Sequence, residues 1–232
     1  MHSRCKSKLL LIIIVYLMLL PAGRALSEES KDLPQKAATP AKASSDSPVV
    51  RVNGTAITRA ELDRAARVIK AQSPAGSKLT ENDILDELIS TELLYQAGSK
   101  LPIRDLDKQV EERMARNRAQ YPDSAAFESA LKAAGLTPKE LEELARKDIV
   151  IKRLVDKEIA PKVSVSKTEA RKFYDENRER FKQGEKEAVI AKFEEVEGKI
   201  QDYLKRAKIR KALGDYVGKL REQAKIERMD TK

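Results

Sequence analysis

Few residues of this chain have the types and the spacing that catalysis needs. Ser129 to Lys132 and Ser164 to Lys167 repeat the Ser-x-x-Lys spacing of penicillin-recognising enzymes, in which the serine is the nucleophile. The Ser-Asp-Asn and Lys-Thr-Gly motifs that accompany that spacing are absent from the sequence. Gly214 to Lys219 is one residue short of a phosphate-binding loop and lacks the hydroxyl residue after its lysine. Neither acyl transfer nor nucleotide binding is indicated.

Charged residues make up 36% of the chain, with both signs mixed along it. Paired carboxylates such as Glu111-Glu112, Glu142-Glu143 and Glu194-Glu195 have the chemistry of acid-base catalysts, but Lys and Arg flank them, which is typical of a solvated helix face. The run from Lys205 to Lys211 is the one dense basic patch, suited to anionic lipid or an acidic partner, although the acids shortly before it favour a dipolar solvated helix. This mixture argues against a nucleic-acid partner.

The first 25 residues have the pattern of a secretory signal. Arg4, Lys6 and Lys8 precede an apolar run from Leu9 to Leu20, and small residues precede a cleavage point after Ala25. The run is shorter than the span of about 20 apolar residues that a membrane anchor needs, so cleavage is expected. A retained signal is the alternative, and membrane contact is expected only in that case. The signal predicts a location outside the cytoplasm.

Cleavage would remove the only histidine, His2, and the only cysteine, Cys5. The mature chain would then have no imidazole base, no thiol nucleophile and no soft-metal ligand, which excludes zinc sites, thiol chemistry and disulfides. Four bases and no acid would also leave, lowering the formal net charge from +9 to +5. We therefore expect no catalytic residues, no metal and no cofactor.

Folded sequence is expected from Val49, after a disordered linker over residues 26–48 that is rich in Ser, Lys, Ala and Pro. Val49, Val50 and Val52 lead into Asn53-Gly54, which predicts a hairpin that returns through Ala56-Ile57. A short strand at 225–227 is free to pair with this hairpin. The predicted sheet is therefore minimal.

Helix-capping patterns divide most of the remaining chain. Capping boxes predict helices that begin after Thr58, Thr80, Thr137 and Ser166. Asp105 and Asp123 are expected to cap two further helices, of which the second ends at Gly135. The helix after Thr137 should reach about Ile159, where Pro161 breaks it, and the helix after Ser166 should end near Phe181.

The stretch from Glu185 to Ala224 keeps an approximate helical period and contains no proline, so it predicts one long helix, or two that separate near Gly198. Gly214 and Gly218 form a Gly-x-x-x-Gly pair there. Because Asp215 and Lys219 rule out a membrane helix, we expect this pair to serve close packing between soluble helices. The fold class is therefore mainly α, with several helices and a small β-sheet made by the N-terminal hairpin and the C-terminal strand.

Several segments together resemble the SurA, PpiD and PrsA family of exported chaperones. They are, in order along the chain, residues 49–58 with Glu61-Leu62, residues 84–97, residues 127–135, residues 144–154, and residues 165–177 with Phe181. In that family a parvulin-type prolyl isomerase domain of about a hundred residues follows the last of these segments. Here residues 188–226, which resemble the helix and strand found after that domain, follow within a few residues. The resemblance therefore implies a chaperone core without the isomerase domain, which agrees with the missing histidines.

The resemblance implies a division into an N-terminal helical chaperone domain, residues 49–160, and a segment that completes the module, residues 161–232. It implies ATP-independent binding of unfolded exported polypeptides, notably outer-membrane protein precursors, without enzymatic activity. Tyr121, Phe127, Phe181 and Tyr216 are the candidate client contacts, although each is also a plausible core residue. A prolyl isomerase and a membrane-held adaptor are the alternative functions.

Overall fold

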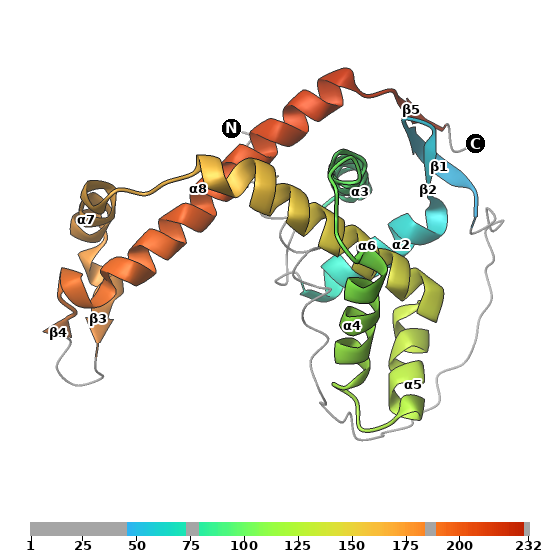
Figure 1. Cartoon of the computed structure of the whole chain (residues 1–232), viewed down its shortest axis with the longest axis horizontal. Helices are drawn as coiled ribbons and strands as arrows, with labels where there is room; N and C mark the ends of the chain where they lie inside the picture. Colours follow the sequence, from blue (N-terminus) through green and yellow to red (C-terminus); the bar gives the residue numbers. More distant parts are fainter. Residues whose placement is uncertain (1–45, 73–78, 184–188, 230–232) are drawn as a thin grey trace. The chain divides into compact units, whose positions relative to one another are not determined.

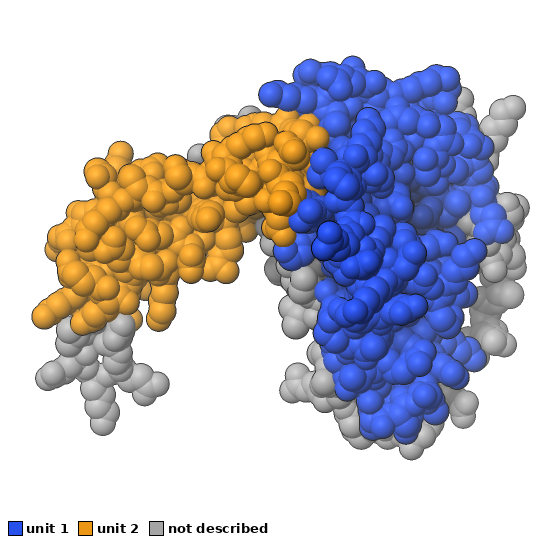
Figure 2. Space-filling model, viewed as in Figure 1, with its two compact units in different colours: residues 1–153, 219–232 blue, residues 154–218 orange. Residues whose placement is uncertain are grey.

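The computed structural model describes residues 46–72, 79–183 and 189–229, so the predicted signal and most of the predicted linker lie outside the described residues. The chain is mainly helical, as the sequence predicts, and divides into two compact units. Unit 1 comprises residues up to Arg153 together with Lys219 onward, and unit 2 comprises Leu154–Gly218 (Figure 2). Each unit has its own hydrophobic cluster.

Unit 1 begins with the predicted hairpin of β1 (Pro48–Val52) and β2 (Thr55–Thr58) (Figure 1). Asn53 and Gly54 turn the chain with positive φ angles of 53° and 89°, which a glycine and an asparagine tolerate better than other residues. The predicted C-terminal strand, β5 (Ile226–Arg228), pairs antiparallel with β1. The sheet order is therefore β2-β1-β5, with the first strand in the centre.

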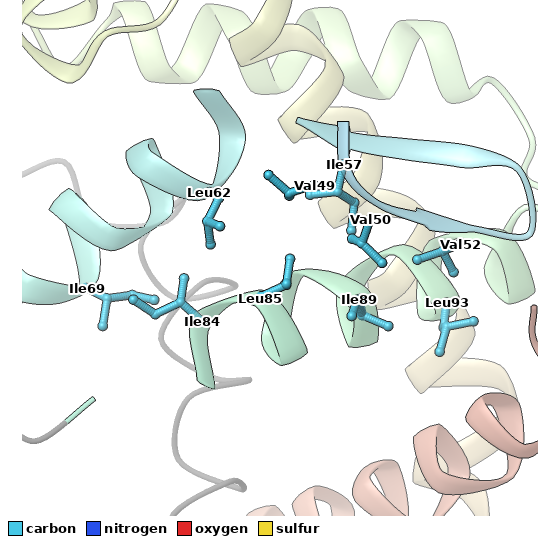
Figure 3. Close-up of a cluster of buried hydrophobic side chains, with 10 residues drawn as sticks. All are labelled: Val49, Val50, Val52, Ile57, Leu62, Ile69, Ile84, Leu85, Ile89 and Leu93. Carbon is cyan, nitrogen blue, oxygen red and sulfur yellow. The ribbon is translucent and has the colours of Figure 1, made fainter. Parts of the chain in front are cut away.

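The main core of unit 1 is aliphatic (Figure 3). Val50 and Val52 of β1 are fully buried in one cluster with Ile89 and Leu93 of α3 (Glu81–Gly98), whose Ile84 lies beside Ile69 at the other end of the cluster. Leu62 and Ile69 of α2 (Arg59–Gln72) close the same cluster. The helix predicted after Thr80 therefore contributes Ile84, Leu85, Ile89 and Leu93 to this core.

Three further helices complete the N-terminal part of unit 1: α4 (Leu106–Arg118), α5 (Ser124–Ala134) and α6 (Pro138–Leu154). The Thr80–Asp83 box and the Thr137–Glu140 contacts form as predicted, and Asp123 accepts a hydrogen bond from the Ala126 amide at 2.7 Å. Gly135 ends α5 with a φ of 67°. The local capping patterns therefore place these helix ends correctly.

The capping role predicted for Asp105 is wrong. Asp105 does precede α4, but its backbone is left-handed, with φ 52° and ψ 40°, and its side chain makes no capping hydrogen bond. A side-chain cap needs an extended backbone, which turns the carboxylate toward the free amides of the first turn. Asp105 therefore turns the chain into the helix through its backbone.

Polar and charged side chains are buried within unit 1. Glu92 of α3 is 4% exposed and forms an ion pair with Lys147 of α6 at 2.8 Å. Asp148 is paired with Arg113 of α4 at 3.2 Å. A Cβ built at Gly98 of α3 would lie 2.8 Å from the Val150 carbonyl oxygen of α6. These contacts fix how α3, α4 and α6 pack.

The segment that opens unit 2 departs from the prediction at Pro161. Helix α6 continues through a π-helical turn (Val155–Ile159) into a short 3-10 helix (Ala160–Lys162), which includes the proline. The predicted Ser166–Glu169 box then starts α7 (Lys167–Glu176), and a second 3-10 turn reaches Phe181. Pro161 fits this turn because the first turn of a helix has amides that need no partner.

Helix α8 (Phe193–Gln223) is continuous through Gly198, so the single-helix alternative is correct. It starts later than predicted, because β3 (Lys182–Gln183) and β4 (Val189–Ile190) form a small antiparallel ribbon that the sequence pattern did not reveal. The close packing predicted for Gly214 and Gly218 is wrong, since a Cβ at either position would meet no atom of the described residues within 4 Å.

The predicted fold class is confirmed: helices dominate, and the hairpin and C-terminal strand form the small sheet. No helix within the described residues is long and apolar enough to cross a membrane. The functional division at residues 160 and 161 remains a prediction.

Candidate peptide-binding surface

Aromatic residues concentrate in unit 2. The chain has four Phe, six Tyr and no Trp, and Leu154–Gly218 contains six of these ten rings. They are Phe173, Tyr174, Phe181, Phe193, Tyr203 and Tyr216. The capping box at Ser166 sets the register of α7, so that Ala170, Phe173 and Tyr174 share one face, three and four residues apart.

Tyr174 anchors this cluster. It is 7% exposed, and its hydroxyl donates a hydrogen bond to the Ala191 carbonyl at 2.6 Å. Its ring lies 5.7 Å from Phe193 and 5.2 Å from Phe181, measured between ring centroids. This combination of apolar burial and one satisfied hydroxyl holds the start of α8 against α7.

The outer edge of the cluster reaches solvent. The half-buried ring of Phe173 lies 5.3 Å from Tyr203 of α8, which is 46% exposed. Within the described residues, no other large hydrophobic side chain is classed as exposed. We call Phe173 and Tyr203 the aromatic edge; it presents an apolar contact beside a rigid, packed cluster.

Cations surround the other side of the cluster. Arg171 lies 5.0 Å above the Phe193 ring and Lys167 lies 5.9 Å above it. These side chains line an open hollow of about 610 Å³ between α7 and the start of α8, together with Asp175, Glu176 and Glu194. Arg171 contacts both Asp175 at 3.4 Å and Glu194 at 3.8 Å, so the hollow is nearly balanced in charge.

The two carboxyl groups with the largest pKa shifts do not form a catalytic pair. Burial raises the pKa of Glu87 to about 8, although the charge of Arg221 opposes this. A hydrogen bond from Lys208, helped by the Ser166 amide, lowers the pKa of Glu169 to about 2. Glu87 lies on α3 and Glu169 on α7, each in its own unit.

The Ser-x-x-Lys motif at Ser164 does not form a nucleophile and base in this structure. Lys167 is paired with Glu197 at 3.3 Å, and Lys208 donates to the Ser164 backbone carbonyl at 2.8 Å. No cluster of three or more metal-ligating side chains occurs in the described part of the chain. The surface of unit 2 is suited to binding by apolar and charged contacts.

The four predicted client contacts are divided between the units. Tyr121 and Phe127 pack edge to face in unit 1, with centroids 5.5 Å apart, in a small cluster of α4, α5 and α6. Phe127 is 3% exposed and Tyr121 is half-buried. Phe181 packs on the aromatic cluster of unit 2, whereas Tyr216 is half-buried on α8 without a ring contact in the described residues.

Sequence reasoning missed Phe173 and Tyr203 as candidate contacts. Phe173 lies within a segment that carries the family resemblance, but nothing in that segment separates it from core residues. Tyr203 gives no such signal either, because it lies seven residues after Val196 and three after Ile200, at the edge of the apolar stripe of α8. Its spacing alone does not separate a contact residue from a core residue.

Comparison with known proteins identifies the class to which this fold and surface belong. Residues 4–155 match the SurA-like N-terminal domain, which covers more than half of the chain. The chain therefore belongs to the SurA-like N-terminal domain family.

The matching curated proteins are foldases. Over 161 residues the chain is 30% identical to foldase protein PrsA of Clostridium botulinum strain Hall and 29% identical to that of strain 657. Each match covers 60% of this chain and 48% of the relative, so the chain spans about half the length of these proteins. One similar solved structure comes from work on PEB4 and Cj1289, two SurA-like chaperones of Campylobacter jejuni. It aligns at 15% sequence identity with a TM-score of 0.49, and the alignment covers 80% of this chain and 100% of the solved chain.

The described residues contain no parvulin domain. The chain passes from Phe181 through the β3–β4 ribbon to α8, which begins at Phe193. An isomerase domain of about a hundred residues does not fit in that interval.

Proposed function

We propose that this protein is an ATP-independent chaperone that binds unfolded exported polypeptides in the periplasm, including outer-membrane protein precursors, and has no prolyl isomerase activity. The observation that carries the proposal is the SurA-like family match in a chain whose described residues lack a parvulin domain. The aromatic edge supports it, because exposed rings beside a charged surface suit sequence-tolerant contact with unfolded chains.

The four aromatic residues predicted from the sequence belong to this proposal. Tyr121, Phe181 and Tyr216 are half-buried, so part of each ring is available to a client. Phe127 is buried beneath Tyr121 and is proposed to support that ring. Photo-crosslinking from each position to an unfolded precursor tests the assignment. Crosslinks from Tyr121, Phe181 and Tyr216 support it, and their absence at all three positions refutes it.

The test of the function is suppression of aggregation. A urea-unfolded outer-membrane precursor and an unrelated unfolded soluble enzyme are diluted with and without the purified protein, in the absence of ATP. The expected result is reduced light scattering for both clients. If neither client is protected, the proposal is wrong; if a single folded partner binds instead, the adaptor alternative is correct.

The isomerase alternative is favoured by the foldase names of the PrsA relatives. A tetrapeptide isomerisation assay separates the two functions, since the chaperone proposal expects no rate above the uncatalysed reaction. Clear catalysis would establish the isomerase instead.

The proposed location includes cleavage of the signal after Ala25. N-terminal sequencing of the protein recovered from the periplasmic fraction should begin at Leu26. An intact N-terminus in the membrane fraction would show a retained anchor.

A further inference from the structure

One exposed face of α8 carries cations on both sides of Tyr203. Lys199, Tyr203, Arg206 and Arg210 follow each other at steps of four, three and four residues, so they lie on one stripe of the helix. Lys199 and Arg206 are exposed and Arg210 is half-buried. We call these four residues the cationic strip; all of them belong to unit 2.

The cations of this strip differ from two other cations of α8, which form ion pairs. Lys208 and Lys211 of the same helix pair with Glu169 at 2.6 Å and with Asp215 at 2.8 Å. Within the described residues, Lys199, Arg206 and Arg210 form no ion pair. Arg206 donates only to the backbone carbonyl of Asp202, at 3.3 Å.

Two carboxylates lie near the strip and reduce its charge without cancelling it. Asp202 is exposed beside Tyr203 and forms no ion pair within the described residues. Glu195 lies at the start of α8, where its carboxylate accepts a hydrogen bond from the Lys192 amide at 3.2 Å. Three cations with free donors therefore remain along the strip.

We propose that the cationic strip, with the Phe173 ring beside Tyr203, binds acidic stretches of unfolded client chains through their carboxylates and one apolar anchor residue. The proposal rests on the proposed chaperone function and names the client chemistry. The apolar anchor packs on Tyr203 and Phe173, which lie 5.3 Å apart, and the carboxylates meet Lys199, Arg206 and Arg210.

The dimensions of the strip define the length of the client segment. Lys199 and Arg210 are eleven residue steps apart on the helix, which is about 16 Å at 1.5 Å per residue. An extended chain covers that length with about five residues. The predicted recognition unit is therefore about five residues, with acids on both sides of an apolar residue.

The test uses three fluorescein-labelled, unstructured peptides and the full-length protein. The first peptide carries one phenylalanine among Asp and Glu, the second has Lys in place of the acids, and the third keeps the acids but has Ser in place of the phenylalanine. Three surface charge contacts, each worth about two- to threefold, predict that the first peptide binds about tenfold more tightly than the second in low salt. The preference should weaken as salt is raised.

The matched variants have equal changes in net charge. The triple variant Lys199→Glu, Arg206→Glu, Arg210→Glu should abolish the preference for acids. The control triple Lys157→Glu, Arg180→Glu, Lys205→Glu changes three exposed cations of unit 2 that also form no ion pair in the described residues, and it should keep the preference. Equal losses in both variants would show that net charge alone is responsible and would overturn the proposal.

A single substitution tests the apolar anchor. Tyr203→Ser should weaken binding of the first peptide about fivefold and leave the third unchanged, since the third has no anchor. Circular dichroism checks that every variant is folded. If the wild-type protein suppresses aggregation but shows no preference for acids, the strip proposal fails and the chaperone proposal stands. If it suppresses no aggregation, the chaperone proposal fails.

Discussion

The two units differ in where they place aromatic and charged side chains. The main cluster of unit 1 is aliphatic, and Glu87, Glu92 and Asp148 are buried within that unit. Unit 2 has an aromatic cluster, and within its described residues no charged side chain is classed as buried. Buried charged groups need matched partners and therefore specify one packing arrangement. Exposed charges contribute little to stability, so they constrain the packing of a surface less. The difference indicates that unit 1 is the framework and unit 2 the more tolerant surface.

The largest expected effect on stability comes from truncating a buried side chain in the core of unit 1. Ile89 is completely buried, so Ile89→Ala should lower the free energy of unfolding by about 4 kcal/mol. The matched change in unit 2, Ile200→Ala, should cost less, about 2 to 3 kcal/mol, because a smaller cluster relaxes around the cavity. Hydrogen exchange should rise in β1 and α3 for the first variant and in α7 for the second. Equal increases in both units for either variant would show that they unfold together.

The second prediction concerns the buried carboxyl of Glu87, which is 6% exposed. Burial raises the pKa from 4.5 to about 8, against the charge of Arg221 and together with that of Asp86. The folded state therefore holds a proton that the unfolded state releases, so the free energy of unfolding should fall as pH rises from 4.5 to 8. Glu87→Gln should remove this fall and gain about 2 to 4 kcal/mol relative to wild type between these pH values.

Urea titrations of both proteins across that pH range measure the difference directly. Asp148 is shared by the two proteins, so its own raised pKa cancels in the comparison. A difference that stays constant with pH would mean that Glu87 is ionised in the folded protein, beside Arg221.

The third prediction contrasts two glycines. A Cβ at Gly98 would lie 2.8 Å from the Val150 carbonyl oxygen, so Gly98→Ala should cost about 2 kcal/mol as α3 and α6 move apart. Gly214 of α8 has open space around it, so Gly214→Ala should instead gain up to about 1 kcal/mol through helix propensity. Thermal unfolding of both variants gives the signs. Destabilisation by both would show that the Gly-x-x-x-Gly pair has a packing role after all.

The smallest predicted effect is in the aromatic cluster of unit 2. Tyr174→Phe removes the hydroxyl that donates to the Ala191 carbonyl and should cost about 1 kcal/mol. Tyr203→Phe is the control, since that side chain is exposed, and it should have almost no effect. Urea denaturation measures both. A larger loss for Tyr174→Phe than for Ile200→Ala would contradict the view that unit 2 tolerates change.

The sequence predicted those features that depend on a few neighbouring residues. Thr80 and Ser166 begin helices through contacts three residues away, and Asn53-Gly54 makes a turn by its own backbone preference. The ribbon of β3 and β4 and the open space at Gly214 depend on distant packing, which no local pattern records. For the same reason the sequence identified Phe181 as a candidate contact but missed its neighbour Phe173. The ring of Phe173, on α7, contacts that of Tyr203 on α8.

The central position of β1 in the sheet has a consequence for folding during synthesis. Asn53 accepts a hydrogen bond from the Lys225 amide, across 172 residues of sequence, and β5 then covers one edge of β1. Ribosomes deliver the N-terminal end first, so the central strand emerges long before its second neighbour. Until β5 arrives, that edge is open to pairing with any extended chain. A protein proposed to bind other unfolded chains thus has an unpaired strand edge of its own during synthesis.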